Sequence, residues 1–231
     1  MGRKIHPLGF RLGINQKHYS HWFAEPKDYP KFVEEDKRVR TCVEKYLKKR
    51  IKNRFDHDGI GHIDIDRKTD LTGIEIHTGF PDPLIEEHNS GIDQSKNDVK
   101  KIFHFERQKI RVNLRSISQP YGNPRILAGF IASQPTNRVA FRRTIRKTIE
   151  LVGESGNEGV RAQIAGRPNG SEMARVEWTR EGRVPLQTIK ACIDYFHHPA
   201  QTIYGVSGTK VWVSRGQGES KIRKTLKSWA C

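Results

Sequence analysis

Five basic side chains lie within ten residues around the segment FRRTIRKTIE, and their chemistry is that of phosphate binding. A guanidinium group presents its N–H donors in a planar fork that matches the oxygens of a phosphate. A solvated helix face normally mixes acids among its bases, whereas no acid interrupts this cluster. The segment therefore predicts a surface for a polyanion, formed by Arg138, Arg142, Arg143, Arg146 and Lys147.

Other reactive residue types occur without the neighbours that catalysis or metal binding requires. DHD at 56–58 lies in a predicted turn, and no further metal ligand is close in the sequence. GQG at 216–218 lacks the downstream Lys and Ser/Thr of a phosphate-binding loop. EWTREGR at 177–183 contains Arg180 and Arg183 beside two glutamates, which favours a salt-bridged turn with some RNA contact. The sequence names no nucleophile–base pair and predicts no enzyme, no cofactor and no metal site.

The overall charge identifies the class of partner. The 231 residues carry a formal net charge of +16, with a sequence pI near 9.9. Such an excess attracts nucleic acid or anionic lipid. No apolar run approaches the length of a membrane span, and the first residues lack the apolar core of a signal peptide. Three widely spaced cysteines form neither a disulfide framework nor a metal knuckle. We therefore expect a nucleic-acid partner, no membrane and a reducing compartment.

The charge is concentrated in three separate places. Residues 101–147 contain one acid, Glu106, among many lysines and arginines. The first 17 residues have no acid, and the tail after Val213 is again basic. This distribution favours a protein embedded in nucleic acid over one that holds it in a single cleft.

The periodicity of the first half predicts an α+β domain. Apolar residues at helical spacing indicate a helix over about 30–53. GHIDIDRK and DLTGIEIHT alternate as half-buried strands, QSKNDVKKIFHF reads as a helix, and QKIRVNLRSI reads as a third strand. SQPYGNP then forms a linker, because it combines two prolines with a glycine.

The second half predicts two helices followed by four strands. The helices span about 124–134 and 137–152, and the strands are VRAQIAG, EMARVEWTR, IKACIDYFHH and TIYGVSGTKVWVS. Two helices on one face of a mostly antiparallel sheet satisfy this pattern. We thus expect a basic arm at 1–29, domains at 30–118 and 119–214, and a weakly ordered basic tail at 215–231.

The cationic segment is amphipathic when drawn as a helix. At 100° per residue, an arc of about 100° holds the apolar side chains and Thr148, the width of a core-facing stripe. Arg142, Arg143, Arg146 and Lys147 fill the adjoining arc. One side is expected to pack on the sheet while the other presents cations in a rigid row.

Several long motifs resemble a known family. MGRKIHPLGFRLG, AGRPNGSEMARVEWTREGRVPLQTIKACIDY and TIYGVSGTKVWV look like the third protein of the bacterial-type small ribosomal subunit. HYSHWFAEPKDY and NRVAFRR further resemble its plastid-encoded branch. The likeness covers nearly the whole chain except the last fifteen or so residues, and the long C-terminal motif is highly specific.

The resemblance implies a fold and a set of sites. Residues 30–118 would form a type II KH-like domain, followed by the α+β domain specific to the family. Cations on the long helix of that second domain would line the messenger entry channel, here Arg142, Arg143 and Arg146. Partners would be small-subunit rRNA, mRNA and the tenth and fourteenth small-subunit proteins. We expect the remaining rRNA contacts from Arg3, Lys4, Arg11, Arg138, Lys147, Arg180 and Arg183.

One departure bears on the KH expectation. A KH domain clamps four nucleotides with a GxxG loop, and TGFPDPLIEEHNSGIDQSKNDV contains none. The segment is also acidic, which would repel a phosphate backbone. We therefore expect a KH scaffold without its own single-strand recognition. This argues against the alternative of a free KH-type RNA regulator, and a nuclease or DNA-repair role lacks the required metal or base cluster.

Two expectations concern origin. The plastid-like stretches favour a chloroplast ribosome, with a bacterial cytoplasm as the alternative. Ser207 and Thr209 stand where the family has Leu and Ile, and Thr179 where plastid relatives often have Ile. Each change needs only one C in place of T. We hypothesise C-to-U editing of the transcript, with a diverged lineage as the alternative.

Overall fold

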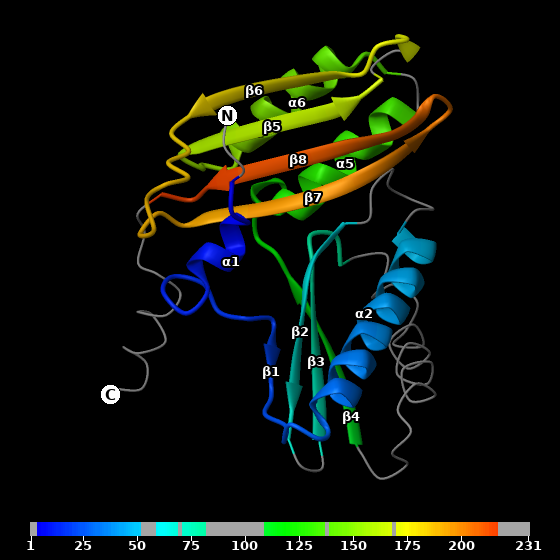
Figure 1. Ribbon diagram of the computed structural model, residues 1–231, viewed down its shortest axis with the longest axis vertical. Helices are drawn as coiled ribbons and strands as arrows, with labels where there is room; N and C mark the ends of the chain where they lie inside the picture. Colours follow the sequence, from blue (N-terminus) through cyan, green and yellow to red (C-terminus); the bar gives the residue numbers. More distant parts are fainter. Residues whose placement is uncertain are drawn as a thin grey trace. The chain divides into compact units, whose positions relative to one another are not determined.

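The computed structural model describes residues 4–51, 59–68, 71–81, 109–136, 139–167 and 170–216. These ranges form two α+β units, each built on a four-stranded sheet (Figure 1). The N-terminal unit is Tyr19–Pro120, and the C-terminal unit joins Met1–His18 to Tyr121–Cys231. The α+β class predicted from the sequence is confirmed. The predicted arm over 1–29 is instead divided between the two units.

The N-terminal unit consists of one long helix on a mixed sheet. The elements are β1 (Ser20–His21), α2 (Tyr29–Ile51), β2 (Ile60–Arg67), β3 (Leu71–Thr78) and β4 (Lys109–Ser116). The sheet order is β1-β2-β3-β4; β2 and β3 are antiparallel, and the two outer pairs are parallel. The predicted helix at 30–53 and all three predicted strands are confirmed. The helix predicted in QSKNDVKKIFHF and the segment without GxxG lie outside the described residues.

Helix and sheet meet because both carry apolar residues at the correct period. Val39, Val43 and Leu47 recur every fourth residue along α2, so they share one face. They pack against alternate isoleucines of β2 and β3, including Ile65 and Ile74, each fully buried. At the edge of this core, Arg67 pairs with Glu35 at 2.7 Å and Asp36 at 2.8 Å. This buried ion cluster ties β2 to α2.

The C-terminal unit has two helices on one face of an antiparallel sheet. A 3-10 turn (Pro120–Gly122) precedes α5 (Pro124–Thr136) and α6 (Phe141–Glu154). The strands are β5 (Gly159–Gly166), β6 (Arg175–Gly182), β7 (Ile193–Thr202) and β8 (Gly205–Ser214). Their order is β6-β5-β8-β7, and every neighbouring pair is antiparallel. The predicted two-helix, four-strand layer is confirmed.

The helices cover only one side of this sheet. Helix α5 packs over β7 and β8 while α6 packs over β5, and in Figure 1 both lie behind the sheet. The shared core includes Leu127, Ile131, Ile145, Val160 and Val211. The opposite face of the sheet is not covered by either helix. None of the helices that the structure describes combines the length and apolar character needed to cross a membrane.

Candidate nucleic-acid interface

Helix α6 is amphipathic in the way its sequence predicts. Ile145, Thr148 and Val152 are buried against the sheet, and Phe141 and Ile149 are half-buried beside them. Thr144, which the sequence analysis did not assign to the stripe, is also buried. Its hydroxyl and that of Thr148 donate to backbone carbonyls one turn earlier, so both polar groups are satisfied inside the core. The helix therefore has one fixed orientation on the sheet.

The outer face of α6 presents a row of cations. Arg142, Arg143, Arg146 and Lys147 are all exposed. Lys147 pairs with Glu150 at 3.5 Å, whereas in the described part of the chain no carboxylate pairs with the three arginines. The guanidinium carbon of Arg142 lies 5.7 Å from the ring centre of Phe141, within the range of a cation–π contact. The row is thus fixed at its base and open to solvent at its tips.

The start of α6 adds to the positive field. Ala140 occupies the N-cap without a side-chain hydrogen bond, and the first turn contains no acid. The positive end of the helix dipole then lies beside Arg142 and Arg143, an arrangement that costs stability in isolation. A bound anion would interact favourably with both the positive end of the helix dipole and the arginines. This makes the N-terminal half of α6 suited to a phosphate backbone.

Arg11 is in a different environment from the one predicted. It closes the short helix α1 (Pro7–Arg11) and is fully buried. Its Nε donates to the Ala191 carbonyl at 2.8 Å, and Nη2 donates to those of Thr188 at 2.9 Å and Leu186 at 3.1 Å. Burial lowers the pKa of Arg11, and the nearby Cys192 thiol partly counters this. The prediction that Arg11 contacts rRNA is corrected, because the side chain is used within the protein.

The surrounding N-terminal segment is also better ordered than the sequence suggested. The predicted arm contains the short helix α1, in which Pro7 stands in the first turn, where its missing N–H costs nothing. His6 caps this turn by accepting from the Gly9 N–H at 3.4 Å. Lys4 is exposed, while Arg3 lies outside the described residues. Of the predicted N-terminal contacts, Lys4 remains available on the surface.

Arg180 and Arg183 lie at the β6 end of the second sheet. The interpretation of EWTREGR as a salt-bridged turn was wrong, because all but its last residue belong to β6. Both arginines are exposed, and in the described ranges neither is paired with a carboxylate. They line one hollow together with Glu158 and Ser214. Gly182 permits this arrangement, since its φ of 69° lies in the left-handed region and a Cβ there would overlap the Glu158 carbonyl.

Some predicted positions lie outside the described residues, namely Arg138, the DHD segment and the basic tail beyond Gly216. No motif in the sequence marks Arg161, or the group that His62, Asp64 and His77 form in the structure. In that group Asp64 is 3.7 Å from His62 Nε2 and 3.4 Å from His77 Nε2. The two imidazole rings stack at 4.0 Å and 11°. Nearly parallel ring planes at that spacing do not meet at one ion, so this arrangement does not fit a shared metal.

The sequence of this chain matches known proteins over most of its length. Residues 131–213 match the family described as ribosomal protein S3, C-terminal domain. The chain is 62% identical to small ribosomal subunit protein uS3c of Adiantum capillus-veneris, over 93% of this chain and 99% of that protein. Identity to uS3c of Angiopteris evecta is 58%, covering 94% and 100%, and to that of Ginkgo biloba 48%, covering 92% and 98%. The chain therefore belongs to the uS3 family of small ribosomal subunit proteins, in its chloroplast uS3c branch.

Proposed function

We propose that this chain is a structural constituent of the small subunit of a chloroplast ribosome, where it binds rRNA and borders the path of mRNA. The observation that carries the second part is the row of Arg142, Arg143 and Arg146. All three are exposed on a helix whose other side is locked into the core. Phosphate contacts of this kind position a strand without reading its sequence. That property suits a surface over which every message must pass.

Two further assignments accompany this proposal. Residues 30–118 form a KH type II-like scaffold, supported by the described order of α2, β2, β3 and β4. The tenth and fourteenth small-subunit proteins are the neighbours implied by the family resemblance. Lys4, Lys147, Arg180 and Arg183 are the described candidates for rRNA contacts, and Arg138 and Arg3 remain candidates from the sequence. Basic charge on several surfaces favours burial among RNA segments over transient binding.

Sucrose-gradient sedimentation tests the ribosomal part of the proposal. A plastid lysate is fractionated at high salt, and the chain is located by immunoblot. We expect it to migrate with the small subunit, because many phosphate contacts together resist salt that removes a weakly bound protein. Recovery only at the top of the gradient would contradict the proposal and would indicate a free RNA-binding protein.

A further inference from the structure

The face of the C-terminal sheet that α5 and α6 do not cover is called the open face here, and it has an unusual composition. Its β7 side packs against His6 and the 183–192 connection, and its β6 side is exposed. In the strand register, Arg161 is paired with Arg180 on one side and with Trp212 on the other. Side chains two residues apart share a face. The face turned away from α5 and α6 therefore combines three cations with three aromatic rings, namely Arg161, Arg180, Lys210, Trp178, Trp212 and Tyr195.

Carboxylates are confined to the other side of the same strands. Glu177 and Glu181 pair with the core residues Ile164 and Val160, and Asp194 pairs with Val213. No Asp or Glu occupies a paired position on the open face of the described strands. The glutamates of β6 alternate with the residues of the open face and therefore point to its other side. The open face keeps its cations without acids beside them, so it is positively charged.

Arg161 lies between two tryptophans. Its guanidinium carbon is 4.8 Å from the ring centre of Trp178 and 5.2 Å from that of Trp212. Its Nε is buried without a hydrogen-bond partner, and in the described part of the chain no carboxylate pairs with it. The two indoles hold the cation in place by cation–π contact. Arg161 is thus a half-buried cation held between two rings, and its positive charge attracts an anion to this part of the face.

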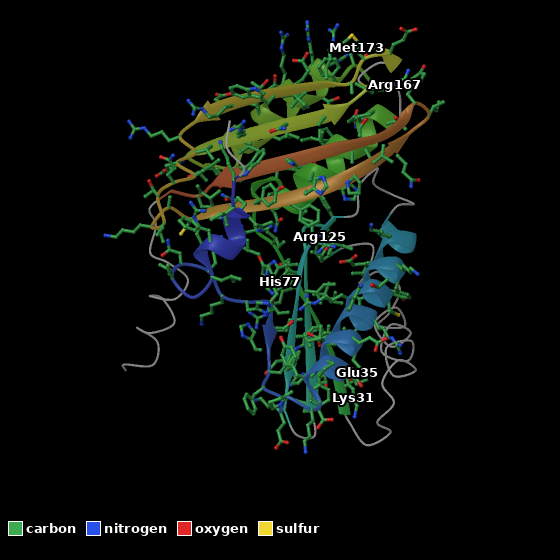
Figure 2. The ribbon with its side chains drawn as sticks, viewed as in Figure 1. Lys31, Glu35, His77, Arg125, Arg167 and Met173 are labelled. Atoms are coloured by element: carbon green, nitrogen blue, oxygen red, sulfur yellow. The ribbon has the colours of Figure 1, made fainter. Side chains whose placement is uncertain are left out.

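The aromatic side chains continue across the sheet. The ring of Trp212 lies 5.2 Å from that of Tyr195, which in turn meets His6 edge-on at 4.9 Å. Trp212 is 9% exposed, whereas Trp178 on the edge strand is 56% exposed. The inner rings are thus part of the packing, and Trp178 leaves much of its surface open to solvent. Trp178 belongs to the edge strand β6. Figure 2 labels Arg167 and Met173, which lie in the connection between β5 and β6 at one end of this edge strand.

We propose that this open face is a binding site for single-stranded RNA. One base stacks on the exposed side of Trp178, and the adjoining phosphates contact Arg161 and Arg180. Stacking on an aromatic side chain requires a base whose flat side is accessible, which a continuous duplex does not offer. A purely cationic surface would not need exposed tryptophan, and a protein-docking surface would not need strand positions free of carboxylates.

This site is separate from the row on α6. The two surfaces lie on opposite sides of one layer, because α6 packs on the covered face of the sheet. The inference relies on the proposed function for the choice of RNA as partner. It adds a second RNA-binding surface to the row on α6. On this second surface, base stacking contributes to binding together with charge. One unit can then hold an rRNA strand on its sheet while messenger passes its helix.

The test uses the full chain and a fluorescein-labelled r(A)8 octamer, with Kd measured by anisotropy at 0.1 and 0.3 M salt. Trp178→Leu removes the ring and keeps apolar bulk. We expect it to weaken octamer binding about tenfold, since base stacking is worth about 1–3 kcal/mol. The weakening should persist at the higher salt, because stacking is less screened than charge. Trp178→Phe should restore most of the affinity.

Phe23→Leu is the matched control, because Phe23 is an exposed aromatic side chain of the N-terminal unit, 89% exposed. It should leave the Kd unchanged. A 5-bromouridine octamer crosslinked by light should, by mass spectrometry, attach to Trp178. Equal affinities of Trp178→Leu and the parent, together with crosslinks only elsewhere, would overturn this inference without affecting the role of α6. Failure of the α6 arginines to affect translation, with Trp178→Leu still weakening octamer binding, would contradict the messenger assignment and support the sheet site.

Discussion

Arg11 and Ala191 are 180 residues apart in the sequence, yet the Arg11 Nε donates to the Ala191 carbonyl at 2.8 Å. Further hydrogen bonds from the same guanidinium reach the carbonyls of Leu186 and Thr188. One buried cation thus holds the connection between β6 and β7 against the start of the chain. The N-terminal segment is part of the C-terminal unit's structure and is not a detached RNA-binding arm.

Replacing Arg11 should therefore destabilise the protein. Arg11→Met keeps a long apolar stem but leaves several buried carbonyls without donors, each costing about 1–3 kcal/mol. We expect a loss of unfolding free energy on the order of 3 kcal/mol in urea denaturation. Lys4→Ala, an exposed change in the same segment, should stay within about 0.5 kcal/mol. Equal stability of Arg11→Met and the parent would contradict the structural role of this residue.

Deletion of residues 1–12 has a related outcome. If residues 1–12 were only part of a detached basic arm, their deletion would weaken incorporation into subunits and leave the folded body intact. The structure instead predicts that the body is itself destabilised, because α1 and Arg11 are removed together. Thermal unfolding followed by circular dichroism should show a lower Tm for the deletion than for the full chain. An unchanged Tm would restore the idea of a detachable arm.

The polar residues of β8 provide a separate prediction. Thr209 is 1% exposed and pairs with the buried Ile164, whereas Thr179 on β6 is exposed. Thr209→Ile should raise the unfolding free energy by about 1 kcal/mol, because it buries additional apolar surface. Thr179→Ile, the matched control, should change it by less than about 0.5 kcal/mol. A lower unfolding free energy for Thr209→Ile would show that the space around position 209 does not accommodate the larger side chain.

The editing hypothesis has its own direct measurement. If the transcript is edited, cDNA should encode Leu, Ile and Ile at positions 207, 209 and 179. Ser207 and Thr209 are both buried, which gives the change a structural benefit at two of the three sites. Unchanged Ser and Thr codons at all three positions would refute editing and favour a diverged lineage.

Tyr195 should make stability depend on pH in the alkaline range. Burial raises the pKa of its phenol above the ordinary value of 10.0. The unfolded chain therefore ionises first, so this contribution is fully present below pH 10 and is lost as pH rises through the folded pKa. Tyr195→Phe should flatten the decline of unfolding free energy between pH 9 and 11. A decline identical to that of the parent would show that other groups cause it.

Local patterns predicted most elements well because they depend on near neighbours. The 100° spacing of α6 separated Ile145 from Arg142 and Arg146 correctly, and alternation located β2 to β8, whereas the two-residue strand β1 was not predicted. Thr144 was missed because a threonine can satisfy its hydroxyl within its own helix, which polarity alone does not reveal. Helix α1 was missed for a related reason, since proline is disfavoured inside a helix but accepted in its first turn, where Pro7 stands.

Contacts between distant segments could not be predicted in the same way. The sequence predicts Arg11 to be a surface cation. In the structure the loop at 183–192 covers it and accepts its hydrogen bonds. Arg161 carries no motif, and its two indole neighbours come from β6 and β8 on either side. Both cases depend on sheet order, which one sequence does not specify. Charge identifies an RNA partner, but burial decides which cations face it.

The control for the central measurement lies on the inner side of α6. Ile145 is 4% exposed and packs in the core of the C-terminal unit. Ile145→Asp should destabilise the protein and prevent its assembly into subunits, because it buries an unpaired charge. Arg142→Ala, Arg143→Ala and Arg146→Ala together should leave the fold intact, since the changes are exposed and alanine favours helix.

Translation rates through structured and unstructured messages test the account most directly. Ribosomes that carry the triple alanine variant are compared with the parent on two messages differing only by a stable hairpin at the entry side. Removal of three fixed cations should weaken the hold on the incoming strand. We predict a nearly normal rate on the unstructured message and a disproportionate slowing at the hairpin. An unchanged ratio of the two rates would contradict the assignment of Arg142, Arg143 and Arg146 to the messenger path.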